Sequence, residues 1–152
     1  MLVIKGHKFS IESGNKDELD FEKQVPKFGA IFQLNRKLFV CGGFVNYEPT
    51  SQFFFLDYLG RAMHLESMKL SRGGVSLSGL TSALIALGGV GQEDDNLKTC
   101  EIYTRASNKW SDLPVLNVER HWPGSVMFKS RKIFCFCGSQ DFEQDLNSIE
   151  SL

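Results

Sequence analysis

Three short apolar runs recur along the chain, and a glycine follows each of them. They are Leu38–Cys41, Ala83–Leu87 and Ile133–Cys137, followed by Gly42-Gly43, Gly88-Gly89 and Gly138-Ser139, at offsets of 46 and 50 residues. Consecutive apolar residues predict β-strands covered on both faces, because a strand with one wet face alternates apolar and polar positions. A glycine pair suits a strand end where φ is positive or a neighbour leaves no room for a Cβ atom. The pattern predicts a β repeat of about 50 residues.

The middle repeat is the most complete. In order, it holds Arg72-Gly73-Gly74, Ala83–Leu87, Gly88-Gly89, Thr99–Tyr103 and, seven residues after the tyrosine, Trp110. The rings of Tyr103 and Trp110 are large and amphipathic, so they suit the gap to the next repeat while their polar ends find hydrogen-bond partners. This conjunction resembles one kelch repeat, the sequence unit of a four-stranded β-propeller blade.

The resemblance implies an all-β chain, a partial kelch-type β-propeller of about 2.5 to 3 four-stranded antiparallel blades. Residues 72–119 are the best-formed kelch blade, and residues 27–71 a degenerate one, with Leu56 at the tyrosine position and Ala62 or Met63 at the tryptophan position. Residues 120–152 are an incomplete blade, because 147–152 aligns with 98–103 and the chain stops at the tyrosine position. Residues 1–26 are an N-terminal strand segment, either the remnant of a preceding blade or a poorly packed extension.

So few blades do not close a ring, since closed propellers have about four to eight. An incomplete ring exposes apolar blade faces and strand edges, which favours association. The alternatives are a piece of a longer protein, a chain that pairs with another chain, and an open arc. Self-association through open blade edges is therefore one expected partner mode.

Composition and charge narrow the partners. The 17 basic side chains are balanced by 18 acidic ones, so no basic excess attracts nucleic acid or anionic lipid. No apolar stretch reaches the roughly 18 residues of a membrane span, and we expect a soluble, cytoplasmic chain. Cys135 and Cys137, two apart in an apolar run, are expected to share one strand face as buried free thiols, which is ordinary in a reducing compartment.

The resemblance places the loops between second and third strands on one face with the links between blades, and partners of this family commonly dock there. Acidic residues gather in two of these loops; they are Glu93, Asp94, Asp95, Asp141, Glu143 and Asp145. Aromatic side chains that could act as anchors are Phe44, Tyr47 and Phe142. We expect a protein or peptide partner with a basic surface. The alternative is that these loops are polar because they are wet and that the aromatics fold back onto the blade edge.

Arg72 and Arg120 each open a repeat and have two interpretations. In related kelch modules an arginine at this place can line the binding face, where its planar fork engages carboxylates. In the structural interpretation the stem packs along the next blade and the head bonds loop carbonyls.

We expect no enzyme activity and no cofactor. The copper-dependent sugar-oxidising branch of kelch-type propellers needs tyrosine and histidine ligands, and His7, His64 and His121 have no metal-site spacing. Cys135 and Cys137 lack a nearby histidine, so neither a thiolate nucleophile nor a zinc site is supported. The main hypothesis is a non-catalytic protein-interaction module that serves as a ubiquitin-ligase substrate adaptor or a scaffold. The alternatives are a fragment of a propeller oxidase and an actin-binding cytoskeletal scaffold.

Overall fold

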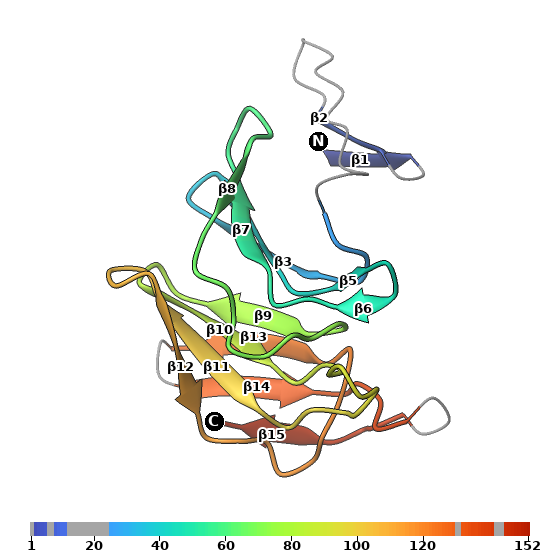
Figure 1. The fold of residues 1–152 in the computed structure, drawn as a ribbon. Helices are drawn as coiled ribbons and strands as arrows, with labels where there is room; N and C mark the ends of the chain where they lie inside the picture. Colours follow the sequence, from blue (N-terminus) through green and yellow to red (C-terminus); the bar gives the residue numbers. More distant parts are fainter. Residues whose placement is uncertain (1, 6–7, 12–24, 130–131, 142–144) are drawn as a thin grey trace.

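The computed structural model describes residues 2–5, 8–11, 25–129, 132–141 and 145–152 (Figure 1). All regular secondary structure in these ranges is β, without a helix. The strands are β1 (Leu2–Lys5), β2 (Lys8–Ile11), β3 (Ala30–Leu34), β4 (Lys37–Cys41), β5 (Phe44–Val45), β6 (Glu48–Pro49), β7 (Phe53–Leu56), β8 (Ala62–His64), β9 (Ser76–Gly79), β10 (Ala83–Leu87), β11 (Cys100–Thr104), β12 (Lys109–Leu113), β13 (Gly124–Phe128), β14 (Lys132–Phe136) and β15 (Ile149–Ser151). In the same ranges no helix is long and apolar enough to cross a membrane.

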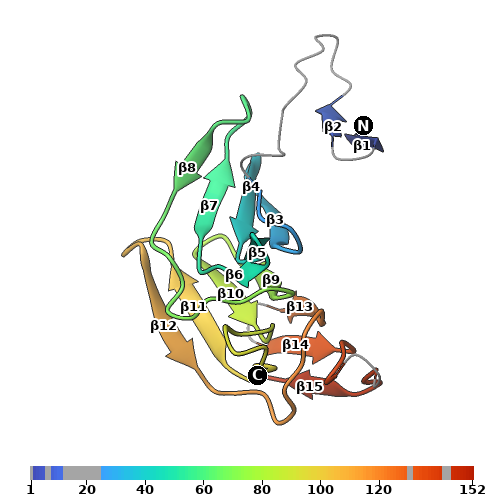
Figure 2. The same ribbon diagram turned by 45° about the vertical axis from the view of Figure 1, so that its right-hand side comes forward.

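Three antiparallel sheets carry the repeat. The first sheet has the order β3-β4-β7-β8, the second β9-β10-β11-β12, and the third β13-β14-β15. Figure 2 shows them side by side along an arc, with β3, β9 and β13 on its inner side. A hydrogen bond of 2.7 Å between the hydroxyls of Ser76 and Ser125 joins β9 to β13. The chain is an all-β partial propeller, and no barrel closes among the described strands. Two further hairpins, β1–β2 and β5–β6, lie outside these sheets.

Aromatic rings fill the space between the first and second sheets. Tyr103 and Trp110 are buried, and both pack on Phe53, with ring centroids 4.7 and 5.0 Å from it. The Tyr103 hydroxyl donates to Asn108 Oδ1 at 2.7 Å, and the Trp110 indole N–H donates to the Glu66 carbonyl at 2.8 Å. Their polar ends therefore find partners as expected. The gap that they fill, however, is the one to the preceding sheet, not to the next one.

Aliphatic and sulfur-containing side chains fill the corresponding space between the second and third sheets. The buried residues there are Ile85, Leu87, Cys100, Leu116, Ile133 and Cys135. None of them is aromatic, so this interface is built from smaller side chains than the one before it.

The turn that follows the second strand of each sheet repeats one backbone conformation. Gly42 and Gly88 have φ of 61° and 62°, and the residue in this place in the third sheet is Cys137, with φ of 56°. Registers confirm the equivalence, because Cys41 pairs with Phe53, Leu87 with Cys100 and Phe136 with Ile149. The expected pair Gly138-Ser139 was thus misplaced by one residue, and the pair is Cys137-Gly138.

The neighbouring link explains why glycine stands in the first two turns. A Cβ atom on Gly88 would lie 2.3 Å from the Arg120 carbonyl oxygen, and one on Gly42 as close to that of Arg72. In the described part of the chain the third sheet has no following link, so the Cβ atom of Cys137 meets no such carbonyl. Cys137 is exposed while Cys135 is buried, so the prediction that both are buried is wrong for Cys137.

The outer face of the third sheet departs from the expected two-sided burial. Along β14, Ile133 and Cys135 are buried, whereas Phe134 and Phe136 are only half-buried. Val126, Phe128 and Ile149 are 50%, 51% and 69% exposed. The prediction of two covered faces is therefore wrong for the third apolar run.

Candidate protein-interaction face

The links between sheets and the loops after the glycine turns meet at one end of the sheets. The contacts are backbone bridges between Lys27 and Phe44, between Gly73 and Val90, and between His121 and Ser139. Each link thus pairs with the loop of its own sheet. Together these segments form the candidate face, which includes the β5–β6 hairpin (Figure 1).

Three aromatic side chains from different segments gather on this face; Phe28, Phe44 and Trp122 are called the aromatic cluster below. The Phe28 ring lies 6.3 Å from Phe44, edge-on, and 6.2 Å from Trp122. Phe28 is 66% exposed and Trp122 51% exposed. Tyr47, at the turn of the β5–β6 hairpin, is 94% exposed. Rings of this size with so much exposed surface make good anchors for a docked chain.

The backbone holds two of these rings in a conformation that bulky residues rarely adopt. Phe28, Gly74 and Trp122 occupy equivalent places in the three links, with φ of 55°, 57° and 51°. Gly74 donates its N–H to the Phe28 carbonyl at 3.1 Å and accepts from the Trp122 N–H at 2.7 Å. A left-handed conformation at a non-glycine residue costs about 1 to 3 kcal/mol, and such outliers cluster at functional sites. The fold therefore tolerates strain to present the two rings.

Gly74 also explains how the rings come together. A Cβ atom on Gly74 would lie 2.7 Å from Trp122 Nε1, and one on Gly73 would lie 1.9 Å from the Phe44 ring. Because both residues lack a Cβ atom, the rings of Phe44 and Trp122 can pack directly against the backbone at Gly73 and Gly74. Their role differs from that of a flexible turn, because here the missing side chains make room for aromatic packing.

An acidic loop adjoins the aromatic cluster. Glu93, Asp94 and Asp95 are exposed in the loop between β10 and β11. Asn96, the next residue, accepts from Nδ1 of His121 at 2.6 Å, and the His121 ring packs on Trp122 with centroids 4.5 Å apart. The Asn96 side-chain amide also donates to the Gln140 carbonyl. These contacts connect the acidic loop to the aromatic cluster.

His121 occupies the junction between these two groups. Burial lowers the pKa of His121, opposed by the nearby negative charge of Asp141. The neutral imidazole therefore persists at physiological pH and donates to Asn96. His121 therefore contacts Asn96 and Trp122 as a neutral ring.

Of the remaining acidic and aromatic candidates, some lie in the described residues and others do not. Asp141 and Asp145 are exposed in the loop between β14 and β15. Phe142 and Glu143, predicted in the same loop, lie outside the described residues. Of the three predicted aromatic anchors, Phe44 and Tyr47 thus lie on the candidate face.

Arg72 and Arg120 lie in the interior and do not belong to this face. Both have no exposed surface. Arg72 donates to the carbonyls of Gly88 and Thr99 at 2.8 and 2.9 Å and pairs with Glu101 at 2.7 Å. Arg120 pairs with Glu150 at 2.5 Å in the same way. A guanidinium without exposed surface cannot contact a docked protein, so the binding-face interpretation is set aside for both arginines, and the structural one describes their contacts.

The buried thiols are poor nucleophiles near neutral pH, because they stay protonated. Burial raises the pKa of Cys100 and of Cys135 to about 11, so both are protonated near neutral pH. Burial also raises the pKa of Cys41 well above its ordinary value. Across the ranges that the structure describes, no group of three His, Cys, Asp or Glu side chains is placed to hold a metal ion.

Sequence reasoning missed Phe28 and Trp122. Neither residue was among the predicted aromatic anchors, although a signal existed in the repeat itself. Aligned on the links, Phe28 and Trp122 stand where the middle repeat has Gly74, and a bulky side chain in a glycine position marks a special conformation.

A scan against protein-family models and a search of the curated proteins found no match to this chain.

Proposed function

We propose that this chain is a kelch-type, non-catalytic protein-interaction module that binds a basic peptide or protein surface through the candidate face. The observation that carries the proposal is the exposed aromatic cluster, held in a strained backbone beside an acidic loop. Aromatic rings attract the ammonium and guanidinium groups of Lys and Arg by about 0.5 to 2 kcal/mol each. Carboxylates around them add long-range attraction and orient the partner.

Charge supports a basic partner over an acidic one. The exposed residues Glu93, Asp94, Asp95, Asp141 and Asp145 lie in two loops of the candidate face. Lys27, next to the aromatic cluster, and Lys98, in the loop between β10 and β11, are exposed cations there, and the acidic groups outnumber them. We place the module in the cytoplasm, where the buried free thiols are ordinary.

The decisive experiment separates binding from folding. Trp122→Gly removes the ring and installs at φ 51° the residue that tolerates this conformation best. Relief of strain offsets the greater flexibility of the unfolded chain, so the melting temperature should change little. Anisotropy of a fluorescein-labelled Arg/Lys-rich peptide should show affinity weakened by about tenfold or more. Unchanged affinity with an intact fold would overturn the proposal.

A charge variant provides the second arm. The double variant Asp94→Asn/Asp95→Asn should weaken binding of the same peptide and reduce the salt dependence of that binding, because two electrostatic attractions that salt screens are lost. Asp112→Asn is the matched control, since Asp112 lies on β12, is 75% exposed and pairs with Lys69 on the surface. An acidic peptide of equal length should not bind. Equal effects of the Asp94/Asp95 and Asp112 variants would contradict a role for the acidic loop.

A further inference from the structure

The near-zero net charge of the chain conceals a separation of charge along the sheets. The hairpin turns that join neighbouring strands lie at the end of the sheets opposite the candidate face (Figure 1). Seven described cations lie in or beside these turns, and together they are called the basic end: Arg36, Lys37, Arg61, Arg105, Lys109, Lys129 and Lys132. The exposed carboxylates of the two acidic loops lie at the other end. The overall charge balance therefore does not describe either end.

Few carboxylates neutralise the basic end within the described part of the chain. Asp57 pairs with Arg61 at 2.7 Å. Glu66 is exposed and borders the turn between β11 and β12, because its N–H donates to Asn108 Oδ1 at 3.2 Å. Seven cations against these two carboxylates leave the basic end positive and able to attract an anion.

Two of the cations occupy backbone positions that glycine fits best. Asn35 and Arg36 form the two-residue turn between β3 and β4, with φ of 49° and 60°, and glycine is the favoured second residue of such a turn. Lys129 has φ of 47° in the turn between β13 and β14. Residues in this strained region cluster at functional sites. The first and third sheets thus each place a positive charge where a glycine would be less strained.

Exposed aromatic rings accompany the cations at both ends of the row. Tyr58, in the turn between β7 and β8, is 78% exposed, and Phe128, beside the turn after β13, is 51% exposed. Asp57 Oδ1 accepts from the N–H groups of Leu59 and Arg61 at 2.8 and 3.0 Å, which fixes the turn that carries Tyr58. An exposed ring in a basic surface can stack on a nucleic-acid base of any sequence.

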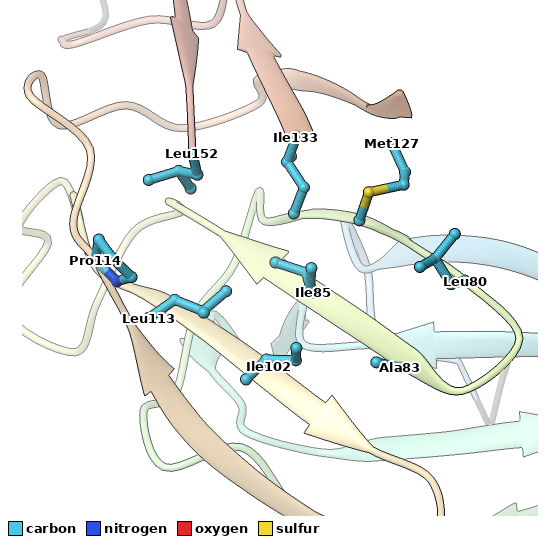
Figure 3. Close-up of a pocket in the computed structure, with 9 residues that line it drawn as sticks. All are labelled: Leu80, Ala83, Ile85, Ile102, Leu113, Pro114, Met127, Ile133 and Leu152. Carbon is cyan, nitrogen blue, oxygen red and sulfur yellow. The ribbon is translucent and has the colours of Figure 1, made fainter. Parts of the chain in front are cut away.

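The turns of the second sheet favour one kind of anionic partner. Thr81, Ser82 and Ser107 are exposed there, between the aromatic rings of the first and third sheets. Hydroxyls bond well to phosphate and sugar, whereas their transfer into the hydrocarbon of a bilayer is unfavourable. The apolar pocket between the second and third sheets (Figure 3) has only aliphatic, proline and methionine side chains in its lining, so it offers a phosphate no partner. Cations spread over three sheets suit a chain of repeated phosphates better than one acidic side chain.

We infer that the basic end binds single-stranded nucleic acid. Phosphates lie along the row of cations, and bases stack on Tyr58 and Phe128. This site is separate from the candidate face, which is acidic and lies at the other end of the sheets.

A charge variant that preserves the turns tests the phosphate contacts. Arg36→Gly/Lys129→Gly removes two cations and installs the residue that both φ angles favour, so the melting temperature should not fall. The probe is a fluorescein-labelled oligouridylate of about 12 nucleotides, followed by anisotropy from about 50 to 200 mM salt. The wild type should bind it, and in the variant the slope of log affinity against log salt should be shallower by about 1.4. The matched control, Lys27→Ala/Lys98→Ala, removes two exposed cations from the other end and should change neither affinity nor slope.

A pair of tyrosine variants tests base stacking. Tyr58→Ala should weaken oligouridylate binding at least about fivefold, because a stacked base is lost. Tyr47→Ala, which removes a 94% exposed ring from the candidate face, should leave it unchanged. A sugar-phosphate chain of the same length without bases should bind more weakly than oligouridylate, and Tyr58→Ala should not weaken it further.

Four results would overturn the inference. The first is absence of saturable oligouridylate binding up to about 100 μM chain at the lowest salt. The second is an equal loss of affinity in the two charge variants or in the two tyrosine variants. The third is tighter binding to phosphatidylserine vesicles or to polyglutamate, which would make a bilayer or an acidic protein the occupant. The fourth is a dimer that Arg36→Gly/Lys129→Gly dissociates, without oligouridylate binding, since the acidic loops of a second copy would then be the partner.

Discussion

Removal of the Arg72 guanidinium tests what holds the links to the sheets. Arg72 has no exposed surface, and its partner Glu101 is 1% exposed. The Glu101 carboxylate also accepts from the backbone N–H groups of Lys69 and Leu70 at 2.8 and 3.2 Å. Arg72→Met keeps the apolar stem and deletes the charge. It leaves a buried carboxylate with two neutral donors and no cation.

The expected loss is large. Breaking a buried ion pair by removing one partner destabilises a protein by about 3 to 5 kcal/mol. The carbonyls of Gly88 and Thr99 also lose one donor each, although the Thr99 carbonyl keeps the Gly88 N–H, so the upper end of that range applies. The free energy of unfolding of a small domain is about 5 to 15 kcal/mol, so the single variant should lose a third or more of its stability.

Urea denaturation followed by tryptophan fluorescence and circular dichroism measures this loss. Glu101→Gln keeps acceptor capacity for the two backbone N–H groups, and the double variant Arg72→Met/Glu101→Gln removes both charges. The double variant should be more stable than the sum of the single losses predicts, by about 1 to 3 kcal/mol, because contacting charges couple.

The first sheet shows why this recovery is expected. By register, Phe54 stands in the place of Glu101, and buried Pro26 in the place of Arg72. Both charges are replaced there by apolar groups, so a sheet of this kind holds without the pair. A loss below about 1 kcal/mol for Arg72→Met, or strict additivity of the two single variants, would refute the reasoning.

Three further predictions follow from the same geometry. Gly88→Ala should cost at least about 1 to 3 kcal/mol in urea denaturation, because its left-handed φ of 62° is strained with a Cβ atom, whereas Cys137→Ala should be nearly neutral. Stability should fall as the pH drops below about 4.5, since burial would raise the pKa of Glu150 but backbone N–H donors and Arg120 together hold it below 4.5; a flat profile in pH-dependent melting would contradict this. The chain should self-associate with rising concentration in sedimentation equilibrium, and the double variant Val126→Ser/Phe128→Ser should weaken that association; a wild-type monomer throughout would contradict it.

The repeat was predictable from the sequence because burial and backbone conformation act locally. The runs that became β4 and β10 are buried along most of their length, and their glycine turns have the expected positive φ. The third turn was misplaced because the sequence shows where glycine occurs and not why. Gly88 is required by the Arg120 carbonyl that approaches it, whereas no link follows the third sheet within the described residues.

The candidate site was less predictable, because it depends on which links come together. Phe44 and Tyr47 were expected from their polar surroundings, and both lie on the candidate face. Phe28 and Trp122 are 94 residues apart, and only the arc of sheets brings their rings to 6.2 Å. The sequence left a surface and an interior interpretation open for Arg72, and the structural one was preferred. Its partner Glu101 decides for the interior, and no spacing rule pointed to that pair.

The second ion pair connects the third sheet to the link that precedes it. Arg120 lies in the link before this sheet and binds Glu150 on β15, and Glu150 also accepts from the Asn117 and Val118 N–H groups. These contacts fix β15 to the link before it. Arg120→Met leaves the Glu150 carboxylate, 9% exposed, with two backbone donors and no cation, so urea denaturation should show a loss of about 3 to 5 kcal/mol, as for Arg72→Met. A loss below about 1 kcal/mol would contradict the equivalence of the two ion pairs.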